Sequence, residues 1–238
     1  NVRLLTSMKS PTGSLVKDDI SQEFEKHGYV VRCFEINAKN YGVPQHRERV
    51  VFLALRSDLN YIPYPPEWTH GEHPDIFGST PTCRTFEDAC SDLPYLESGD
   101  SSGDPLHEAV KHPRHVIDWL WDVPEGRSAH DNQDLSKRPP SGYNTTYKRQ
   151  VWCEPASTVQ TTFGMISGCR NVHPIATRSL TVREAARIQS FPDSYRFEGN
   201  LGAIRTGIGN AVPPLLAYCI ALYVRDAIRS CKSTPPLS

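Results

Sequence analysis

The 238-residue sequence lacks a strong net charge, a long apolar run and a secretory leader. Lys and Arg together number 26 and Asp and Glu number 27, so the formal net charge is −1. A whole-chain basic signal for nucleic acid is therefore missing, although a local basic patch is compatible with this balance. Since no apolar stretch is long enough to cross a bilayer and no signal peptide is present, we expect no membrane partner.

The cysteines also lack a recognisable framework. They are seven in number, which is odd, and none forms a C-x-x-C pair. This pattern argues against a disulfide scaffold and against a zinc site. We therefore expect reduced thiols in an intracellular protein and no metal among the site residues.

Proline, in contrast, is abundant. Most of the 20 prolines lie between residues 63 and 155, which predicts a long irregular region in the middle of the chain. Hydrophobic residues make up 38% and charged residues 22%, a composition typical of globular rather than disordered proteins. The chain begins with Asn1 and runs at once into an apolar segment, so we expect a fragment or a processed chain.

The first 59 residues have the pattern of one end of an α/β sheet. Residues 2–5 resemble the end of a buried strand, and residues 14–27 form a helix pattern. Two stretches rich in β-branched and aromatic residues, 29–36 and 49–55, are predicted strands. Because only about a dozen loop residues join these strands, an antiparallel pair is favoured over a parallel crossover.

Hydrophobic periodicity fails from residue 60 to about residue 149. Short helices are predicted at 85–93 and 106–120, and short strands at 150–153 and 157–162. Loops dominate this region, and binding residues concentrate on loops.

The stretch from residue 178 to residue 216 contains two predicted helix starts. The first is a T-x-x-E capping box, in which Thr181 and Glu184 each accept from the other's backbone N–H. The helix should continue to about Ser190, because Pro192 stops it. Taken alone, the capping box indicates only a well-formed helix.

The second predicted start lies between Gly209 and Pro214. Asn210 is a favourable N-cap, and prolines are tolerated in the first helical turn. Gly207 and Gly209 allow the backbone to approach a ligand closely just before a helix with free N–H groups. The last helix is predicted from about residue 213 to residue 229.

Two stretches carry side chains suited to recognition. In the loop before the second strand, Arg47 and Arg49 favour planar anion or base-edge recognition, with a structural salt bridge to Glu48 or another carboxylate as the alternative. Residues 147–149 and 155–162 mix basic, hydroxyl and amide groups that can bond phosphates and base edges. For this second stretch, a polar edge strand is the alternative.

Three motifs in this order resemble the C-terminal half of the cytosine-5 DNA methyltransferases. GVPQHRER at 42–49 is similar to the family's Q-x-R-x-R motif, and RSLTVREAARIQSFPD at 178–193 to its next motif. IGNAVPP at 208–214 is similar to its last motif. The pair Thr158-Val159 resembles the threonine–aliphatic pair of the family's target-recognition domain, and Asn1-Val2 the end of its E-N-V motif.

The resemblance implies an α/β fold, namely the C-terminal part of a Rossmann-like S-adenosylmethionine-dependent methyltransferase domain with an inserted, loop-rich target-recognition region. Residues 1–59 would belong to the catalytic domain, and residues 60–177 would form the target-recognition region. Residues 178–230 would return to the catalytic domain, with the motif at 178–193 docking the recognition region on it. Residues 231–238 are expected to be a disordered tail.

The resemblance also implies roles for individual residues. Arg49 would bond the flipped cytosine near its O2, while Arg47 and Gln45 would brace the site, with Arg47 paired to a carboxylate. Three consecutive residues would line the S-adenosyl-L-methionine pocket: Asn210, Ala211 and Val212. Four residues of the recognition region would contact double-stranded DNA: Arg149, Thr158, Val159 and Thr161.

The family's chemistry explains why such donors are needed. The enzyme flips a cytosine out of the duplex, and a cysteine thiolate attacks C6 so that C5 can accept the methyl group. Donors at N3 and O2 stabilise the charge that develops on the ring, as donors do in an oxyanion hole.

The sequence lacks two of the family's motifs. None of the seven cysteines stands in a Pro-Cys-Gln motif, and the glycine-rich cofactor loop is also missing. We therefore expect the N-terminal half of the methyltransferase, from the same gene or from a partner subunit, to be required for activity. The host could be bacterial, with the protein in the cytoplasm and a restriction partner, or eukaryotic, with the protein in the nucleus.

Two alternatives remain open. The chain could be a non-catalytic DNA-binding or regulatory subunit that stimulates a separate enzyme. It could instead be an RNA cytosine-5 methyltransferase of the same fold. The length of the region between residues 49 and 178 favours DNA over RNA.

Overall fold

A long antiparallel hairpin forms the regular part of the fold. The computed structural model describes residues 2–11, 13–73, 80–168 and 170–233. Strand β1 (Tyr29–Asn37) pairs with β2 (Glu48–Arg56) along their whole length, from Tyr29 opposite Arg56 to Asn37 opposite Glu48. Both predicted strands and their antiparallel pairing are confirmed. In the described part of the chain, the sheet has these two strands.

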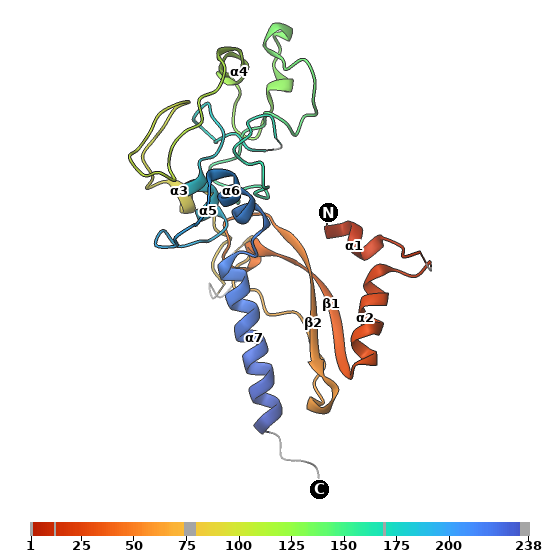
Figure 1. The fold of residues 1–238 in the computed structure, drawn as a ribbon. Helices are drawn as coiled ribbons and strands as arrows, with labels where there is room; N and C mark the ends of the chain where they lie inside the picture. Colours follow the sequence, from red (N-terminus) through yellow and green to blue (C-terminus); the bar gives the residue numbers. More distant parts are fainter. Residues whose placement is uncertain (1, 12, 74–79, 169, 234–238) are drawn as a thin grey trace.

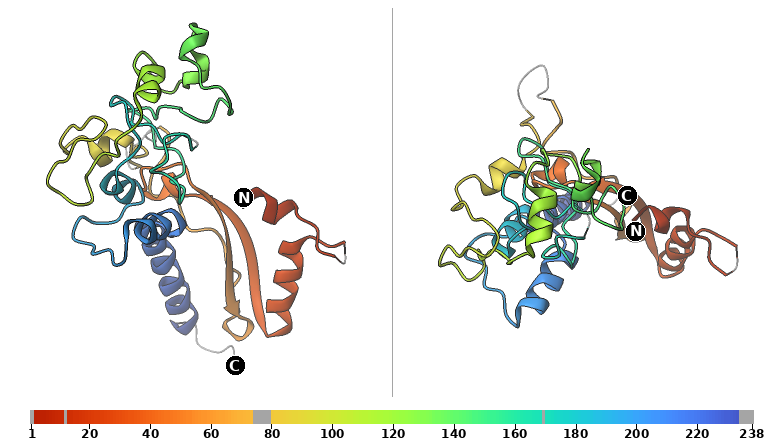
Figure 2. Two further views of the ribbon diagram at one scale, coloured as in Figure 1. Left: turned by 45° about the horizontal axis from the view of Figure 1, so that its top comes forward. Right: turned by 90° about the horizontal axis from the view of Figure 1, so that it is seen from above.

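Helices flank the hairpin on two sides (Figures 1 and 2). Helix α2 (Val16–Lys26), which confirms the helix predicted at 14–27, lies along β1, and α1 (Val2–Ser7) packs near β2. The strand expected at residues 2–5 is wrong, because a short apolar run does not distinguish a strand from a helix by its periodicity. Both views place α7 on the other side of the hairpin from α2.

Helix α7 (Pro214–Ser233) anchors the C-terminal part of the chain on the hairpin. Leu216 is fully buried against Ile36, Tyr41 and Val43, and Leu215, Cys219 and Ile220 pack around this cluster. The predicted apolar face of the helix is thus confirmed in its first two turns. The helix continues through Ser233, so the expected disordered tail does not begin at residue 231; residues 234–238 lie outside the described residues.

The remaining elements gather at one end of the hairpin, where loops dominate (Figure 1). They include four short helices: α3 (Phe86–Cys90), α4 (Arg114–Leu120), α5 (Val182–Ile188) and α6 (Leu201–Asn210). Single turns of 3-10 helix stand in this region at Ala38–Tyr41, Ala129–Asp131 and Leu135–Lys137, and a further one, Ser57–Leu59, follows β2 at the other end of the hairpin.

The predictions for this region are confirmed in part. The helix at 85–93 is present as α3, but only the second half of 106–120 is helical, because α4 begins directly after Pro113. The strands expected at 150–153 and 157–162 are wrong. These segments are turns and irregular chain, and an isolated bridge pairs Ala156 with Gln45.

Two apolar clusters hold the loop-rich region together. One joins α3 and α5 to the segment 156–163 and to Ile208 at the end of α6. The other joins Val116 and Leu120 of α4 to loop residues including Ile166 and Val172. Helix α5 therefore packs inside the loop-rich region, and its capping box forms as predicted, with Thr181 Oγ1 accepting from the Glu184 N–H at 3.2 Å.

Helix α6 replaces the expected loop between the two predicted helix starts. Asn200 caps it, since its side chain accepts from the Ala203 N–H at 2.9 Å. Asn210 is the last residue of α6 and not the N-cap of the following helix, which begins only at Pro214. The predicted helix start at Asn210 is therefore wrong. The local sequence favoured the start of a helix at this position, whereas tertiary packing makes it the end of α6.

Among the described residues, no single helix is long and apolar enough to cross a bilayer. Helices α6 and α7 together would be long and apolar enough, but they are bent by 42° relative to each other, and this comparison considers only length and composition.

The close backbone approach predicted at Gly209 is present, but its partner is this chain and not a ligand. A Cβ at Gly209 would lie 2.4 Å from the Thr161 nitrogen and 2.6 Å from the Gln160 carbonyl carbon. No real Cβ atom tolerates such contacts with backbone. The absence of a side chain at this position therefore allows α6 to pack against the loop at residues 160 and 161.

We expect Gly209→Ala to destabilise the chain, because the added methyl forces α6 away from backbone that has no room to move. The loss should be about 1 to 3 kcal/mol or more in the free energy of unfolding, measured by urea denaturation. Gly207→Ala is the matched control, since a Cβ there meets nothing within 4 Å. That control should be neutral or stabilising by up to about 1 kcal/mol, because alanine is the better helix former. Equal stabilities for the two variants would contradict the packing argument.

Candidate functional site

A cleft of about 1310 Å³ opens where the N-terminal end of β2 meets the loop-rich region and the end of α6. The hairpin contributes Asn37 and residues 46–49, and α6 contributes Gly209 and Asn210. The opposite wall comes mainly from the segment 145–160 and from Arg170. The cleft brings together residues of the motifs at 42–49 and 208–214 and of the segment around Thr158, which are far apart in the sequence, whereas no residue of the motif at 178–193 lines it.

Arg49 lines this cleft from the second residue of β2. Its side chain is half-buried, and one guanidinium nitrogen donates to the Glu48 carbonyl at 2.6 Å. Burial lowers the pKa of Arg49. In the described part of the chain its other guanidinium N–H groups have no hydrogen-bond partner, so they are available to a group in the cleft.

Arg47 also borders the cleft but is almost completely enclosed, with 1% of its surface exposed. One terminal nitrogen donates to the Val159 carbonyl at 3.1 Å, and the other to the Gly209 and Ala211 carbonyls at 2.8 and 2.9 Å. Burial, and then the charge of Arg49, lowers the pKa of Arg47 to about 10, so it remains a cation at neutral pH. The expected carboxylate partner is wrong, because backbone carbonyl oxygens accept from both terminal nitrogens, while the buried Nε has no hydrogen-bond partner among the described residues.

Gln45 completes the same network and is fully buried. Its side-chain oxygen accepts from the Val159 N–H at 3.0 Å and from Arg47 at 3.4 Å. Its side-chain nitrogen donates to the Ile188 carbonyl at 3.3 Å and to the Gln189 side-chain oxygen at 3.1 Å. Sequence reasoning missed Gln189, since the end of a predicted helix gives no sign of a partner 144 residues away.

The threonine–aliphatic pair lies between Gln45 and the cleft. Thr158 lines the cleft, and its hydroxyl donates to the His46 carbonyl at 2.6 Å. Val159 is 2% exposed and packs in the core with Phe163 and Ile188, so its side chain cannot contact DNA. Thr161 is partly exposed but does not line the cleft.

Arg149 does not fit the DNA contact expected from the sequence. The residue is 3% exposed, and one guanidinium nitrogen donates to the Ile175 and Ala176 carbonyls, each at 2.8 Å. The other donates to the Leu120 carbonyl and to Thr177 Oγ1, each at 3.0 Å. These bonds hold the loop at residues 173–177 in place, so this guanidinium is not available to a phosphate or a base.

Other residues bring positive charge and amide groups to the cleft. Lys148 is half-buried, while Arg170 and Gln160 are exposed, and all three line the cleft on the side of the loop-rich region. Lys148 adjoins the predicted Arg149, and Gln160 follows Thr158-Val159 by one residue. Arg170 lies outside every predicted motif and carries no sequence signal beyond its charge.

The predicted cofactor residues lie at the turn between α6 and α7. Asn210 is exposed and lines the cleft, Ala211 is half-buried, and Val212 is 61% exposed. The Gly209 and Ala211 carbonyls turn inward to Arg47. The exposed side chains of this turn can therefore form one edge of a ligand pocket.

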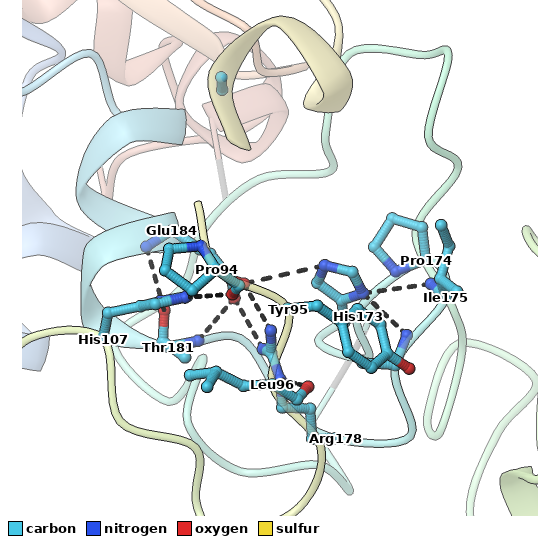
Figure 3. Close-up of polar contacts among 12 residues, drawn as sticks. Pro94, Tyr95, Leu96, His107, His173, Pro174, Ile175, Arg178, Thr181 and Glu184 are labelled. Atoms are coloured by element: carbon cyan, nitrogen blue, oxygen red, sulfur yellow. Dashed lines mark hydrogen bonds and ion pairs between the residues drawn. The ribbon is translucent and has the colours of Figure 1, made fainter. Parts of the chain in front are cut away.

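A second group of titratable residues lies away from the cleft, around the start of α5 (Figure 3). The fully buried Glu184 accepts from Arg178 in two bonds of 2.7 and 2.9 Å and from the Thr181 N–H at 2.8 Å. His107 bonds to Thr181 Oγ1 and to the Pro94 carbonyl, each at 2.9 Å. These bonds tie the loops at residues 94–107 and 171–178 to α5, so the group is structural.

His173 belongs to this second group. Its Nδ1 accepts from the Ile175 and Ala176 N–H groups at 3.1 and 2.9 Å, which places a proton of the neutral ring on Nε2. Nε2 lies 3.8 Å from a Glu184 oxygen. Burial lowers the pKa of His173 to about 4, although Glu184 acts in the opposite direction. The native chain therefore holds His173 neutral at physiological pH.

The chain is similar in sequence to C-5 cytosine-specific DNA methylases, whose family model matches residues 1–225. It is 37% identical over 204 residues to the type II methyltransferase M1.HphI of Haemophilus parahaemolyticus, covering 85% of this chain and 50% of that protein. It is 33% identical over 263 residues to the type II methyltransferase M.DdeI of Desulfomicrobium norvegicum, covering 93% and 60%. The chain thus spans about half to three fifths of the length of these curated relatives.

Solved structures share the fold. A DNA modification methyltransferase encoded within an E. coli prophage superposes with a TM-score of 0.62 at 19% identity, covering 92% of this chain and 66% of that one. The methyltransferase EhMeth of Entamoeba histolytica superposes with a TM-score of 0.51 at 14% identity, covering 90% and 59%. These likenesses confirm the predicted α/β methyltransferase fold.

The buried pair His173 and Glu184 makes the stability of the chain depend on acid pH. The native pKa of His173, about 4, lies below the ordinary value of 6.5, so its contribution is complete above pH 6.5 and is lost as the pH falls toward 4. Burial alone would raise the pKa of Glu184, but Arg178 outweighs it and the pKa falls to about 2, so a further loss follows below pH 4.5. We expect the unfolding free energy to fall by about 3 kcal/mol between pH 6.5 and 4 from His173 alone.

Urea denaturation at a series of pH values measures this loss. His173→Gln removes the titrating ring and should flatten the curve between pH 6.5 and 4. His115→Gln replaces an exposed histidine of α4 and should leave the curve as in the wild type. An unchanged slope in His173→Gln would show that the acid sensitivity has another source.

Proposed function

Because this chain belongs to the C-5 cytosine-specific DNA methylase family, we propose that it is the C-terminal portion of a DNA (cytosine-5)-methyltransferase. The enzyme transfers a methyl group from S-adenosyl-L-methionine to C5 of a cytosine flipped out of double-stranded DNA. One observation carries the proposal: Arg49 offers free guanidinium donors to a cleft whose opposite wall carries Lys148, Arg170 and Gln160. A flipped base and its flanking phosphates require this combination of groups.

Arg49 is the proposed catalytic residue of this chain. When a thiolate adds to C6, negative charge develops on the cytosine ring and on O2. A cationic donor held at O2 stabilises that charge, and it is worth more in a partly desolvated cleft than in water. Arg47 and Gln45 hold the strand end that carries Arg49, and their own polar groups are directed into the protein.

The recognition region supplies the DNA contacts. Lys148 and Arg170 are placed to neutralise phosphates, while Gln160 and Thr158 offer amide and hydroxyl groups to base edges or sugars. Thr161 is partly exposed next to Gln160, and in this proposal it contacts DNA at the edge of the cleft. Residues 60–177 form the recognition region in this proposal, and residues 1–59 and 178–230 belong to the catalytic domain. The network that links Gln45 to the last turn of α5 supports the docking role of residues 178–193.

The turn after α6 is the proposed edge of the cofactor pocket. The exposed Asn210 and Val212, with Ala211 between them, fit this role because Arg47 holds the adjacent carbonyls inward and leaves these side chains outward. S-adenosyl-L-methionine supplies an electrophilic methyl group when it is bound. Asn210 would donate or accept a hydrogen bond to its polar part, and Val212 would cover an apolar part.

Methyl transfer in this proposal needs a further protein segment. No cysteine of the 238-residue sequence stands in the Pro-Cys-Gln motif that carries the family's nucleophile. The N-terminal half of the methyltransferase, from the same gene or a partner subunit, supplies it. The protein acts inside the cell on DNA, and the two curated relatives described above are type II methyltransferases of bacteria, so we place it in a restriction–modification system of a bacterial cytoplasm.

Replacing Arg49 tests the catalytic assignment. In the chain combined with the segment that carries Pro-Cys-Gln, Arg49→Ala should lower the rate of methyl transfer to a cytosine-containing duplex by about two to three orders of magnitude. Arg56→Ala is the control, because Arg56 stands at the other end of β2, is exposed and pairs with Asp58. Transfer of labelled methyl groups measures both rates, and a loss of less than tenfold in Arg49→Ala would contradict the role of Arg49.

Salt dependence tests the DNA contacts independently of catalysis. Lys148→Ala and Arg170→Ala should each weaken duplex binding and reduce the slope of log K against log salt by about 0.9, the value for one phosphate contact. Arg225→Ala on α7, where Arg225 pairs with Asp226, should leave the slope unchanged. Fluorescence anisotropy with labelled duplex measures the binding of each variant at a series of salt concentrations.

The same binding measurement with tRNA, together with a methylation assay on tRNA, tests the RNA alternative. Tighter binding and faster methylation of tRNA than of duplex DNA would favour the RNA enzyme over the DNA enzyme.

A further inference from the structure

Gln189 connects two parts of the cleft that the proposed function assigns to different ligands. One is the loop 158–160, on the DNA side, and the other is the segment 208–211, on the cofactor side. We propose that Gln189 is a positioning residue that makes these two segments move as one unit, so that duplex binding and the shape of the cofactor edge are coupled. This inference rests on the proposed function for the identity of the two ligands, DNA and S-adenosyl-L-methionine. The coupling between the two segments rests on the hydrogen bonds described below.

The position of Gln189 fits this role. It follows directly after α5 and is fully buried. Its side-chain nitrogen donates to the Ile208 carbonyl at 2.6 Å, and its side-chain oxygen accepts from Gln45 at 3.1 Å. Ser190, the next residue, has a φ of 65° and turns the chain sharply away, and its hydroxyl accepts from the Leu215 N–H at 3.1 Å. The amide of Gln189 therefore stands at a fixed point between α6 and the start of β2.

The hydrogen bonds continue in one chain from the DNA side to the cofactor side. The Val159 N–H donates to Gln45, Gln45 donates to Gln189, and Gln189 donates to Ile208 at the end of α6. Every donor and acceptor of the Gln45 side chain is occupied, which fixes the direction of the chain. Displacing one end would leave buried amide groups unpaired, and such groups are costly.

A second path runs parallel to the first. Arg47 donates to the Val159 carbonyl on the DNA side and to the Gly209 and Ala211 carbonyls on the cofactor side. Without Gln189, Arg47 would still attract these carbonyls, but a single guanidinium tolerates tilting of either segment. The two paths together fix both the separation and the orientation of the segments. Because coupling between two sites is reciprocal, a ligand on either side would order the other side.

Hydrogen exchange measured by mass spectrometry tests the coupling on the chain as it stands. Gln189→Met keeps an unbranched side chain of similar length and removes both polar groups. We expect amides in 158–162 and in 208–212 to exchange on the order of tenfold faster in this variant. Exchange in the strands and around the buried Arg178–Glu184 pair should stay as in the wild type. Faster exchange throughout the loop-rich region would show a merely structural role and overturn the proposal.

Arg187→Ala is the matched control. Arg187 lies two residues before Gln189 on α5 and bonds to Asp92 and Asp193 at the surface. Its loss should affect those surface contacts and leave 158–162 and 208–212 unchanged. If Gln189→Met does not fold, the same comparison is made with Gln189→Asn, which keeps the amide on a shorter stem that cannot reach Gln45 and Ile208 together.

A second measurement adds a pool of cytosine-containing duplexes. In the wild type, duplex should slow exchange in both 158–162 and 208–212, and in Gln189→Met only in 158–162. Protection confined to 158–162 in the wild type, or protection of both segments in the variant, would overturn the coupling while the proposed function stands. If duplex protects neither segment, the DNA-binding part of the proposed function fails, and the coupling is judged by the duplex-free comparison alone.

Discussion

The buried guanidinium of Arg47 is the interaction on which the rest of the site depends. An enclosed cation is costly unless hydrogen bonds replace its water. Here the carbonyl oxygens of Val159 in the loop-rich region and of Gly209 and Ala211 at the end of α6 take the place of water, so Arg47 holds these backbone segments close to one another. A carboxylate would have satisfied the charge locally. Carbonyls instead bring to Arg47 two segments that each lie more than one hundred residues from it in the sequence.

The loop-rich region uses the same principle throughout. It has few strands and helices to satisfy its backbone, so side chains must bond to backbone groups. Arg149 gathers the carbonyls of one loop, His173 accepts two N–H groups of that loop, and Gln45 fixes Val159. With these polar groups turned inward, the groups left on the cleft wall, such as Lys148 and Arg170, are those available to DNA in the proposed function.

Features set by neighbouring residues were predictable from the sequence. The capping box at Thr181, the β1–β2 hairpin and the apolar face of α7 follow from local spacing, and all three are present. The resemblance in three motifs also indicated the fold, and it drew attention to Arg49, which lines the cleft. Prediction from local sequence failed at α1, where a short apolar run fits a strand as well as a helix, and at α6, where glycines weaken the helical pattern.

By itself, the sequence determined the capping box at Thr181, the paired strands β1 and β2, the apolar face of α7 and the family that the chain resembles, because these depend on spacing along the chain. Only the tertiary structure decided what the polar residues bond. Arg149 and Arg47 were expected to contact DNA and a carboxylate, respectively, yet both are buried and donate to backbone carbonyls. Gln189 gave no signal. The partner of a buried side chain depends on which distant segment packs against it. The spacing of residues along the chain carries no information about that packing.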